Sequence, residues 1–237
     1  MKDKRNLDLT QRNEEVREKR VIKVIELELS EICDQFNENI QSIRDKFNTA
    51  DKLLKENDNE SYKDILRSQI VFLDSALDYY MHCITKYGMN KMFRCEWDKT
   101  DKYNNFMVPL EKVEYVIKNI EDVAWFIELV NNTYAKDTFM EANSIKSQLS
   151  LIGIKFSDIA KDVCCEESNM QKQLDKLKSL LNSLFYRRNA IAHQSDRLHE
   201  DGKKKEITKE DVEYYIDAVK KIVISIQNQI ENKNSKE

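Results

Sequence analysis

Residues 169–197 read NMQKQLDKLKSLLNSLFYRRNAIAHQSDR, and this stretch decides how the rest of the chain can fold. Apolar residues recur at helical spacing along its first half, at Leu174, Leu177, Leu180, Leu181, Leu184 and Phe185. That spacing predicts an amphipathic helix from Asn169 to about His193, with one face against a core. The far end of the same helix carries Arg188 and Asn189 close to the histidine. The stretch therefore predicts both a helical core and a candidate site.

Helical periodicity also marks six other segments, which are residues 11–57, 62–87, 110–131, 138–151, 157–163 and 208–230. The second of these is unusually apolar, so we expect it to be the central helix, ended by Gly88. Thr208 followed by Asp211 resembles a capping box at the start of the last helix. The chain has only three glycines and one proline, too few for the many turns of a β-rich fold. We therefore expect an all-α protein.

The polar segment 55–61 (KENDNES) is the first clear break in the helical pattern. It divides the expected organisation into an N-terminal helical segment, residues 1–60, that packs on a helical domain, residues 61–237. The first ten residues are polar, and we expect their ends to fray.

Composition narrows the class of protein. The chain has 39 basic and 43 acidic residues and a net charge of −4, so an RNA site has to be a local basic patch. Five cysteines without a C-x-x-C pair favour neither a disulfide framework nor a zinc cluster, and we expect no metal and no cofactor. No apolar run approaches the length of a membrane span, and the charged N-terminus lacks a signal-peptide core. These features favour a cytoplasmic protein.

The end of the 169–197 stretch contains residue types suited to phosphate-ester chemistry. His193, one of three histidines, can transfer protons near neutral pH, and Arg188 can bind phosphate oxygens. Asn189 precedes His193 by four residues and shares its face if the helix continues. Arg188 and His193 are five residues apart, roughly 140° around an ideal helix. They converge only if the arginine reaches round, the helix distorts or a second subunit completes the site.

The run RRNAIAHQSDR resembles the R-x4-6-H motif of the HEPN superfamily, in the form found in its RiboL-PSP-HEPN subgroup. Residues 75–80 (SALDYY) and 151–154 (LIGI) resemble two further elements of that subgroup. The resemblance covers roughly residues 62–230. It implies a HEPN-like helical bundle with long antiparallel helices, to which the N-terminal helical extension is added.

The resemblance also implies a function. Many superfamily members are metal-independent endoribonucleases that act as homodimers, in which the Arg and His of two protomers meet across a two-fold cleft. On that basis His193 transfers the proton, Arg188 clamps the phosphate, and Asn189 orients the imidazole or binds the phosphate. The partners implied are RNA, a second copy of the chain, and an antitoxin or defence-system protein, since such enzymes include toxins and antiviral effectors.

Basic residues near the motif are candidates for holding the RNA backbone, namely Arg187, Arg197, Lys203, Lys204 and Lys205. Asp78 is a candidate supporting residue or a structural partner of a buried cation, and His82 lies one helical turn after it. One position departs from a toxin subgroup that has tyrosine two residues after the histidine. Here Ser195 stands there, which puts control by modification of that tyrosine in doubt.

Three alternatives stay open at the level of sequence. The chain is a non-catalytic dimeric helical module that binds RNA or a protein partner, as many superfamily members are. It is an accessory subunit whose segment 11–57 packs on another protein. Or His193 is an ordinary helix-terminal histidine, and the arginines beside it only compensate the helix dipole.

Overall fold

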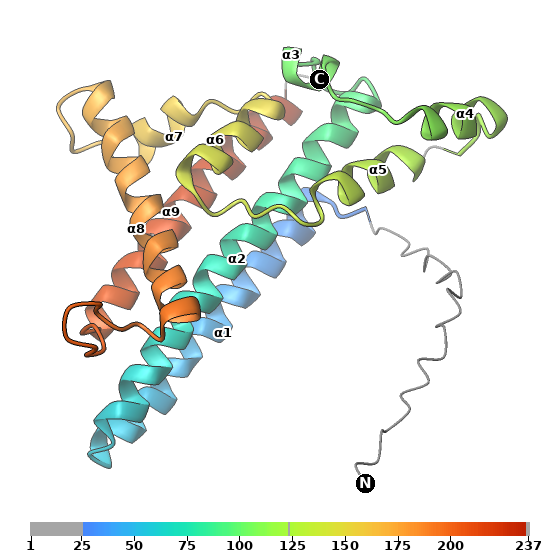
Figure 1. Ribbon diagram of the computed structural model, residues 1–237. Helices are drawn as coiled ribbons and strands as arrows, with labels where there is room; N and C mark the ends of the chain where they lie inside the picture. The colour runs from blue at the N-terminus through green and yellow to red at the C-terminus, as the bar shows by residue number, and fades with distance from the viewer. Residues whose placement is uncertain (1–25, 123, 236–237) are drawn as a thin grey trace, which may run out of the picture.

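The computed structural model describes residues 26–122 and 124–235 of the chain. The expected helical start over residues 11–25, and the polar first ten residues, lie outside this part. The helix predicted through residues 26–28 is wrong there, since Glu28 is an extended N-cap and α1 begins at Leu29. Nine α-helices and no strand occur in the described residues, which confirms the all-α prediction. The helices, shown in Figure 1, are α1 (Leu29–Lys55), α2 (Asn59–Phe93), α3 (Asp101–Asn104), α4 (Leu110–Lys118), α5 (Ala124–Tyr134), α6 (Ala142–Leu151), α7 (Phe156–Val163), α8 (Met170–Gln194) and α9 (Lys209–Asn234).

The long helices α1 and α2 lie side by side and antiparallel (Figure 1). Helix α1 buries one stripe of side chains against α2, at Ile32, Phe36, Ile40, Ile43 and Phe47. The predicted break between the two helices is confirmed at residues 56–58, where the Asp58 side chain accepts from the Ser61 N–H and caps α2. These α1 side chains belong to the same hydrophobic core as the rest of the bundle.

Helix α2 is the central helix, as predicted, because it packs against α1, α5, α6, α8 and α9. Its buried side chains face several directions, and Leu66, Leu73, Leu77 and Ile84 are wholly inaccessible to solvent. Burying such a side chain stabilises a fold by roughly 1.5–3 kcal/mol. Two charged residues, Arg67 and Asp74, are buried on the same helix. They lie seven residues apart, which is two turns, and so share a face.

The predicted stop at Gly88 is wrong, since α2 continues through it to Phe93. The glycine serves close packing instead of ending the helix. A Cβ at this position would lie 2.7 Å from Cγ2 of Ile152, in the turn that follows α6. Only a residue without a side chain lets the two segments approach so closely.

The single helix predicted over residues 110–131 is also wrong, because two helices, α4 and α5, occupy that range. Asp122 lies at the junction, where its carboxylate accepts from the Ala124 N–H at the start of α5 and from the Tyr115 hydroxyl. Helix α5 packs against α2 and buries four of its residues, whereas α4 projects beyond it as an arm (Figure 1). Helix α4 buries none of its residues.

The helix predicted from residue 138 begins later, at Ala142, and ends at Leu151 as predicted. Its expected first turn is instead an irregular segment in which Phe139 and Met140 are buried. The short helix predicted near residues 157–163 is confirmed as α7.

Helices α8 and α9 complete the bundle and follow the predicted ranges within a few residues. The capping box of Thr208 and Asp211 is confirmed at the start of α9. The loop between the two helices, residues 195–208, lies against the first turns of α2. The two segments are far apart in the sequence but close in space. The candidate site is therefore built where the end of α8 meets α2.

Candidate functional site

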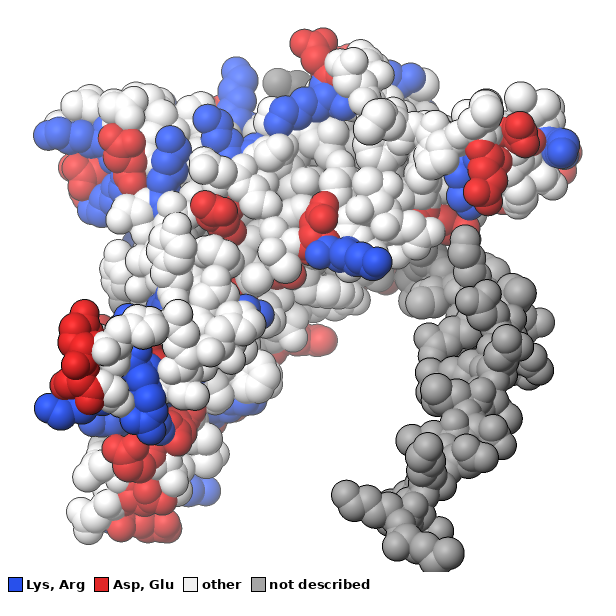
Figure 2. All heavy atoms as spheres, in the orientation of Figure 1, with Lys and Arg blue, Asp and Glu red and all other residues white. Residues whose placement is uncertain are grey.

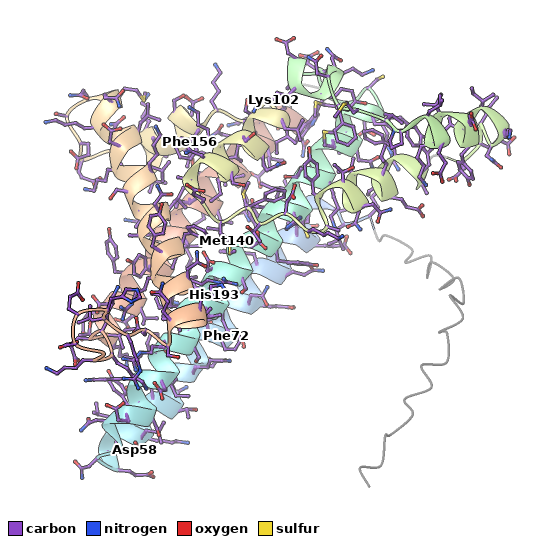
Figure 3. The ribbon with its side chains drawn as sticks, in the orientation of Figure 1. Asp58, Phe72, Lys102, Met140, Phe156 and His193 are labelled. Carbon is purple, nitrogen blue, oxygen red and sulfur yellow. The ribbon has the colours of Figure 1, made fainter. Side chains whose placement is uncertain are left out.

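Helix α8 continues without distortion through His193 and ends at Gln194. The next two residues, Ser195 and Asp196, adopt left-handed backbone conformations, with φ of 51° and 57°. The Asp196 N–H returns to the carbonyl of Ala190 at 2.9 Å and closes the helix end. Figure 3 shows His193 in the last turn of α8. Its side chain is exposed to solvent.

Asp196 is the buried anchor of this helix end. Its side chain is fully inaccessible, and its two carboxylate oxygens face two arginines. Arg67 of α2 donates from Nε to Oδ2 at 2.8 Å, and Arg187 places Nη1 2.8 Å from Oδ1. A buried carboxylate between two guanidinium groups is stable only when all three are present, since an unpaired buried charge is costly.

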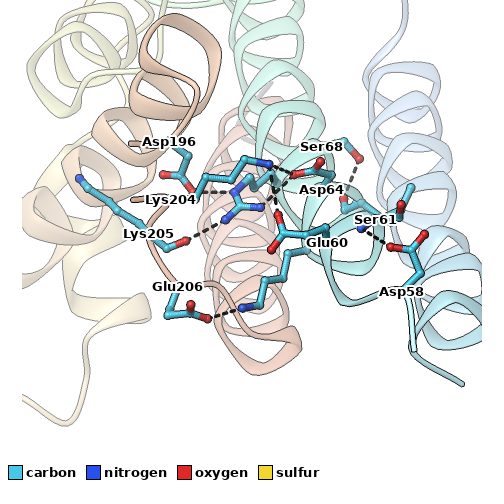
Figure 4. Close-up of polar contacts among 12 residues, drawn as sticks. Asp58, Glu60, Ser61, Asp64, Ser68, Asp196, Lys204, Lys205 and Glu206 are labelled. Carbon is cyan, nitrogen blue, oxygen red and sulfur yellow. Dashed lines mark hydrogen bonds and ion pairs between the residues drawn. The ribbon is translucent and has the colours of Figure 1, made fainter. Parts of the chain in front are cut away.

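Further polar contacts fasten the loop to α2, as Figure 4 shows. Arg67 also donates to the carbonyl of Lys205 and to Asp64, both at 2.9 Å. Lys204 pairs with the same Asp64 at 2.9 Å, and Glu206 with Lys63 at 2.7 Å. These contacts hold the backbone that follows His193, so the exposed imidazole is carried on a fixed helix end.

Arg188 lies on the side of α8 that faces α2 and keeps 23% of its side chain exposed. Its Nη1 donates to Oδ1 of Asn189 at 3.0 Å. Asn189 therefore contacts the candidate phosphate clamp. It makes no hydrogen bond with His193 in the described structure, although the unbroken helix sets the two residues one turn apart as expected.

Asp74 of α2 lies beneath Arg188. Its Oδ2 is 3.5 Å from Arg188 Nε, and its side chain is only 1% exposed. Neither carboxylate oxygen accepts a hydrogen bond in the described structure. Burial raises the pKa of the Asp74 carboxyl to about 7; the Arg188 charge opposes this rise and the Asp78 charge adds to it.

Within one copy of the described chain, no hydrogen bond or ion pair joins Arg188 to His193. The two side chains leave an undistorted helix at positions five residues apart, so neither helix distortion nor direct contact brings them together. Of the three routes to convergence expected from the sequence, distortion is the one that this geometry removes. Two routes to convergence remain, which are a longer reach of the Arg188 side chain and a second subunit that completes the site.

The candidate RNA-binding residues differ in how free their side chains are. Arg187 is only 16% exposed, pairs with Asp196 and donates to the carbonyl of Glu206. Lys204 lies between Asp64 and Glu60. Lys203 is 79% exposed and pairs loosely with Asp201 at 3.2 Å. Arg197 and Lys205 also lie in the loop, the first exposed and the second half-buried.

Asp78 holds a loop and makes no hydrogen bond or ion pair with Arg188 in the described structure. Its Oδ1 accepts from the backbone N–H of Phe139 at 2.5 Å, ahead of α6. His82, one turn later, lies 3.9 Å from the same oxygen and packs against the Phe139 ring at a tilt of 34°. These contacts agree with a structural role for Asp78, while a supporting role in the site stays a prediction.

Three residues of this region were not found from the sequence, namely Arg67, Asp74 and Asp196. The buried charges of α2 interrupt an otherwise apolar helix, and that interruption is the signal that was available. Asp196 stands inside the quoted motif, but only the left-handed turn after Gln194 shows that it points inward.

Surface charge around the site is mixed. On the face shown in Figure 2, basic and acidic side chains are interspersed around the edges, and the middle is mostly uncharged. No group of three or more His, Cys, Asp or Glu side chains suited to a metal occurs in the described residues. Within the same residues no helix is long and apolar enough to cross a membrane.

Comparison with known proteins bears on the family. Searches of curated proteins and of solved structures gave no match. A family model, RiboL-PSP-HEPN, matches residues 28–232, from the start of α1 to the last turns of α9. The HEPN superfamily includes ribonucleases. Since the match spans most of the chain and agrees with its all-α bundle, the chain belongs to the RiboL-PSP-HEPN family.

Proposed function

We propose that the chain is a metal-independent endoribonuclease that works as a homodimer. The observation that carries the proposal is the end of α8, where a partly exposed Arg188 and an exposed His193 stand on one fixed helix of a HEPN-family chain. An exposed imidazole on a helix end anchored by a buried carboxylate is placed to meet a large substrate. As a finer proposal, the enzyme is a cytoplasmic toxin or antiviral effector with an antitoxin or defence-system partner.

The proposed reaction needs only groups of RNA and protein. His193 takes the proton of the 2′-hydroxyl, whose oxygen attacks the neighbouring phosphorus. The bond from phosphorus to the 5′-oxygen breaks, and that oxygen takes a proton from water, which recovers the proton that His193 accepted. Arg188 stabilises the extra negative charge on the phosphoryl oxygens, and Asn189 holds the guanidinium from the side. The products are a 2′,3′-cyclic phosphate and a free 5′-hydroxyl.

RNA is held outside the reacting atoms by the exposed cations of the loop. Lys203 and Arg197 are the strongest candidates, because both are exposed, with Arg197 Nη1 also donating to the carbonyl of Gly202. Arg187, Lys204 and Lys205 contribute positive potential near the helix end, while the first two keep their structural ion pairs.

The test is cleavage of a mixed RNA pool in the presence of a chelator. His193→Ala and Arg188→Ala should each lower the rate at least about 100-fold, the usual size of a lost proton-transfer group or charge stabiliser. His199→Ala is the matched control, since it removes an exposed histidine of the neighbouring loop, and its rate should match wild type. Equal rates in all four proteins would contradict the mechanism.

The second candidate function is a non-catalytic dimeric module that binds RNA or a protein. One observation favours it: no described residue orients the His193 ring, whereas catalytic histidines usually have an orienting partner. RNA binding without cleavage by the wild-type protein, under conditions in which the chain is dimeric, would support this candidate instead.

A further inference from the structure

Asp74 is an unusual residue for its position. It lies in the most deeply buried helix, among side chains such as Leu73 and Leu77 that are wholly inaccessible. A buried carboxylate normally accepts several hydrogen bonds, yet both oxygens of Asp74 lack one in the described structure. If the position served only packing, an apolar residue of similar volume would stabilise the fold better. Its position therefore calls for a role that an apolar side chain cannot fill.

Among the residues that the structure describes, Arg188 is the cation beside this carboxylate. Among the described residues, the charged groups that act on Asp74 are Arg188 from α8 and Asp78 from the next turn of α2. Arg67, two turns earlier on the same face, is committed to Asp196 and Asp64. Asp74 is thus directed at a single guanidinium group.

The contact is made at the inner end of that group. Asp74 Oδ2 faces Nε of Arg188, and that nitrogen is itself buried and lacks a hydrogen bond in the described structure. Nη1 is held sideways by Asn189. A guanidinium group offers five N–H donors in a rigid plane, so the ion pair at Nε and the hydrogen bond at Nη1 restrict the plane and leave its other donors for a phosphate.

We infer that Asp74 is a positioning residue, whose buried carboxylate holds Nε of Arg188 from inside the bundle and aims the guanidinium group at the substrate phosphate. The inference rests on the proposed function, because it assigns Arg188 to the phosphate. Asp74 itself touches neither substrate nor reacting atoms. Its charge state controls Arg188, and it is ionised above about pH 7 and neutral below.

The test compares wild type with Asp74→Asn, which keeps the shape of the side chain and removes its charge. We expect kcat for RNA cleavage to fall about tenfold while KM changes less than about twofold, since a misaligned group costs catalysis more than binding. The ratio of the wild-type to the variant kcat should rise with pH through about 7. His193 is common to both proteins, so this ratio isolates Asp74. Asp162→Asn, which alters a carboxylate between α7 and α9, should match wild type.

A second readout does not depend on activity. In protein labelled with ¹⁵N-arginine, the Nε–H resonance of Arg188, assigned by its loss in Arg188→Lys, should move with pH near 7 in wild type and stay fixed in Asp74→Asn. An unchanged kcat, an unchanged pH ratio or a resonance that is the same in both proteins would overturn the inference. If wild type cleaves no RNA, the proposed function fails, and the resonance alone decides whether Asp74 controls Arg188.

Discussion

At the residue scale, the carboxylate of Asp196 joins three parts of the molecule. It ion-pairs with Arg67 on the central helix and with Arg187 on α8, and its own backbone closes the end of α8. Removing one partner from a buried ionic group leaves the others unpaired, which costs more than the pair itself contributes. Loss of the Asp196 charge should therefore lower the stability of the fold and loosen the helix end that carries His193.

Asp196→Asn should lower the free energy of unfolding by about 3 kcal/mol, because Arg67 and Arg187 both lose the buried carboxylate between them and only Arg67 keeps a second one, that of Asp64. Asparagine tolerates the left-handed backbone of this position, so the substitution isolates the charge. Urea denaturation followed by circular dichroism gives the value. Asp201→Asn is the control, because its partner Lys203 is largely exposed and such pairs contribute roughly 0–1 kcal/mol. Equal losses in the two variants would argue against the buried triad.

At the element scale, the helices predicted best are those with a long stripe of apolar residues on one face. The stripes of α1, α8 and α9 are read directly from the sequence, and so is the capping box at Thr208. The errors at Gly88 and in residues 110–131 have different causes. Whether a helix continues there depends on a distant contact, Ile152 in one case, and on a side-chain cap, Asp122, in the other. Asp122 was a usable start signal; Ile152 was not.

Gly88→Ala should destabilise the fold even though alanine is the better helix former. The added Cβ meets Ile152 at 2.7 Å, and overpacking of this kind costs about 1–3 kcal/mol. That cost exceeds the roughly 1 kcal/mol of helix propensity that alanine adds.

The thermal midpoint measures the net effect of Gly88→Ala. Gly202→Ala serves as the comparison, since nothing lies within 4 Å of the Cβ and only its φ of +69° opposes the change. An increase in the midpoint of Gly88→Ala would show that α2 and the turn after α6 separate easily.

At the scale of the whole molecule, the candidate site is only half predictable from one chain. The motif predicts that Arg188, Asn189 and His193 lie on one helix, and all three lie on α8. The arrangement of Arg188 and His193 toward a common phosphate depends on what a second copy adds, and no pattern within one sequence contains that geometry. The role of Asp74 was likewise unpredictable, because its contact with Arg188 forms only when α8 packs across α2.

Mixing two inactive variants tests the shared site. If Arg188 of one copy works with His193 of the other, a heterodimer of Arg188→Ala and His193→Ala contains one intact site and one doubly altered site. After full subunit exchange the mixture should recover about a quarter of the wild-type rate, since half of the dimers are mixed and each has one of two sites. Each variant incubated alone is the control. A mixture as inactive as its components would place both residues of a site on the same chain.

The projecting helix α4 has a consequence for local opening. It spans nine residues, buries none of them and exposes Leu110, Ile117 and the nearby Ile120 by 68–82%. A helix this short is marginal without tertiary packing. Its backbone amides should therefore exchange with deuterium within seconds, whereas those of α2 should exchange only through global unfolding. Protection of α4 equal to that of α2 would mean that another surface covers the arm in solution.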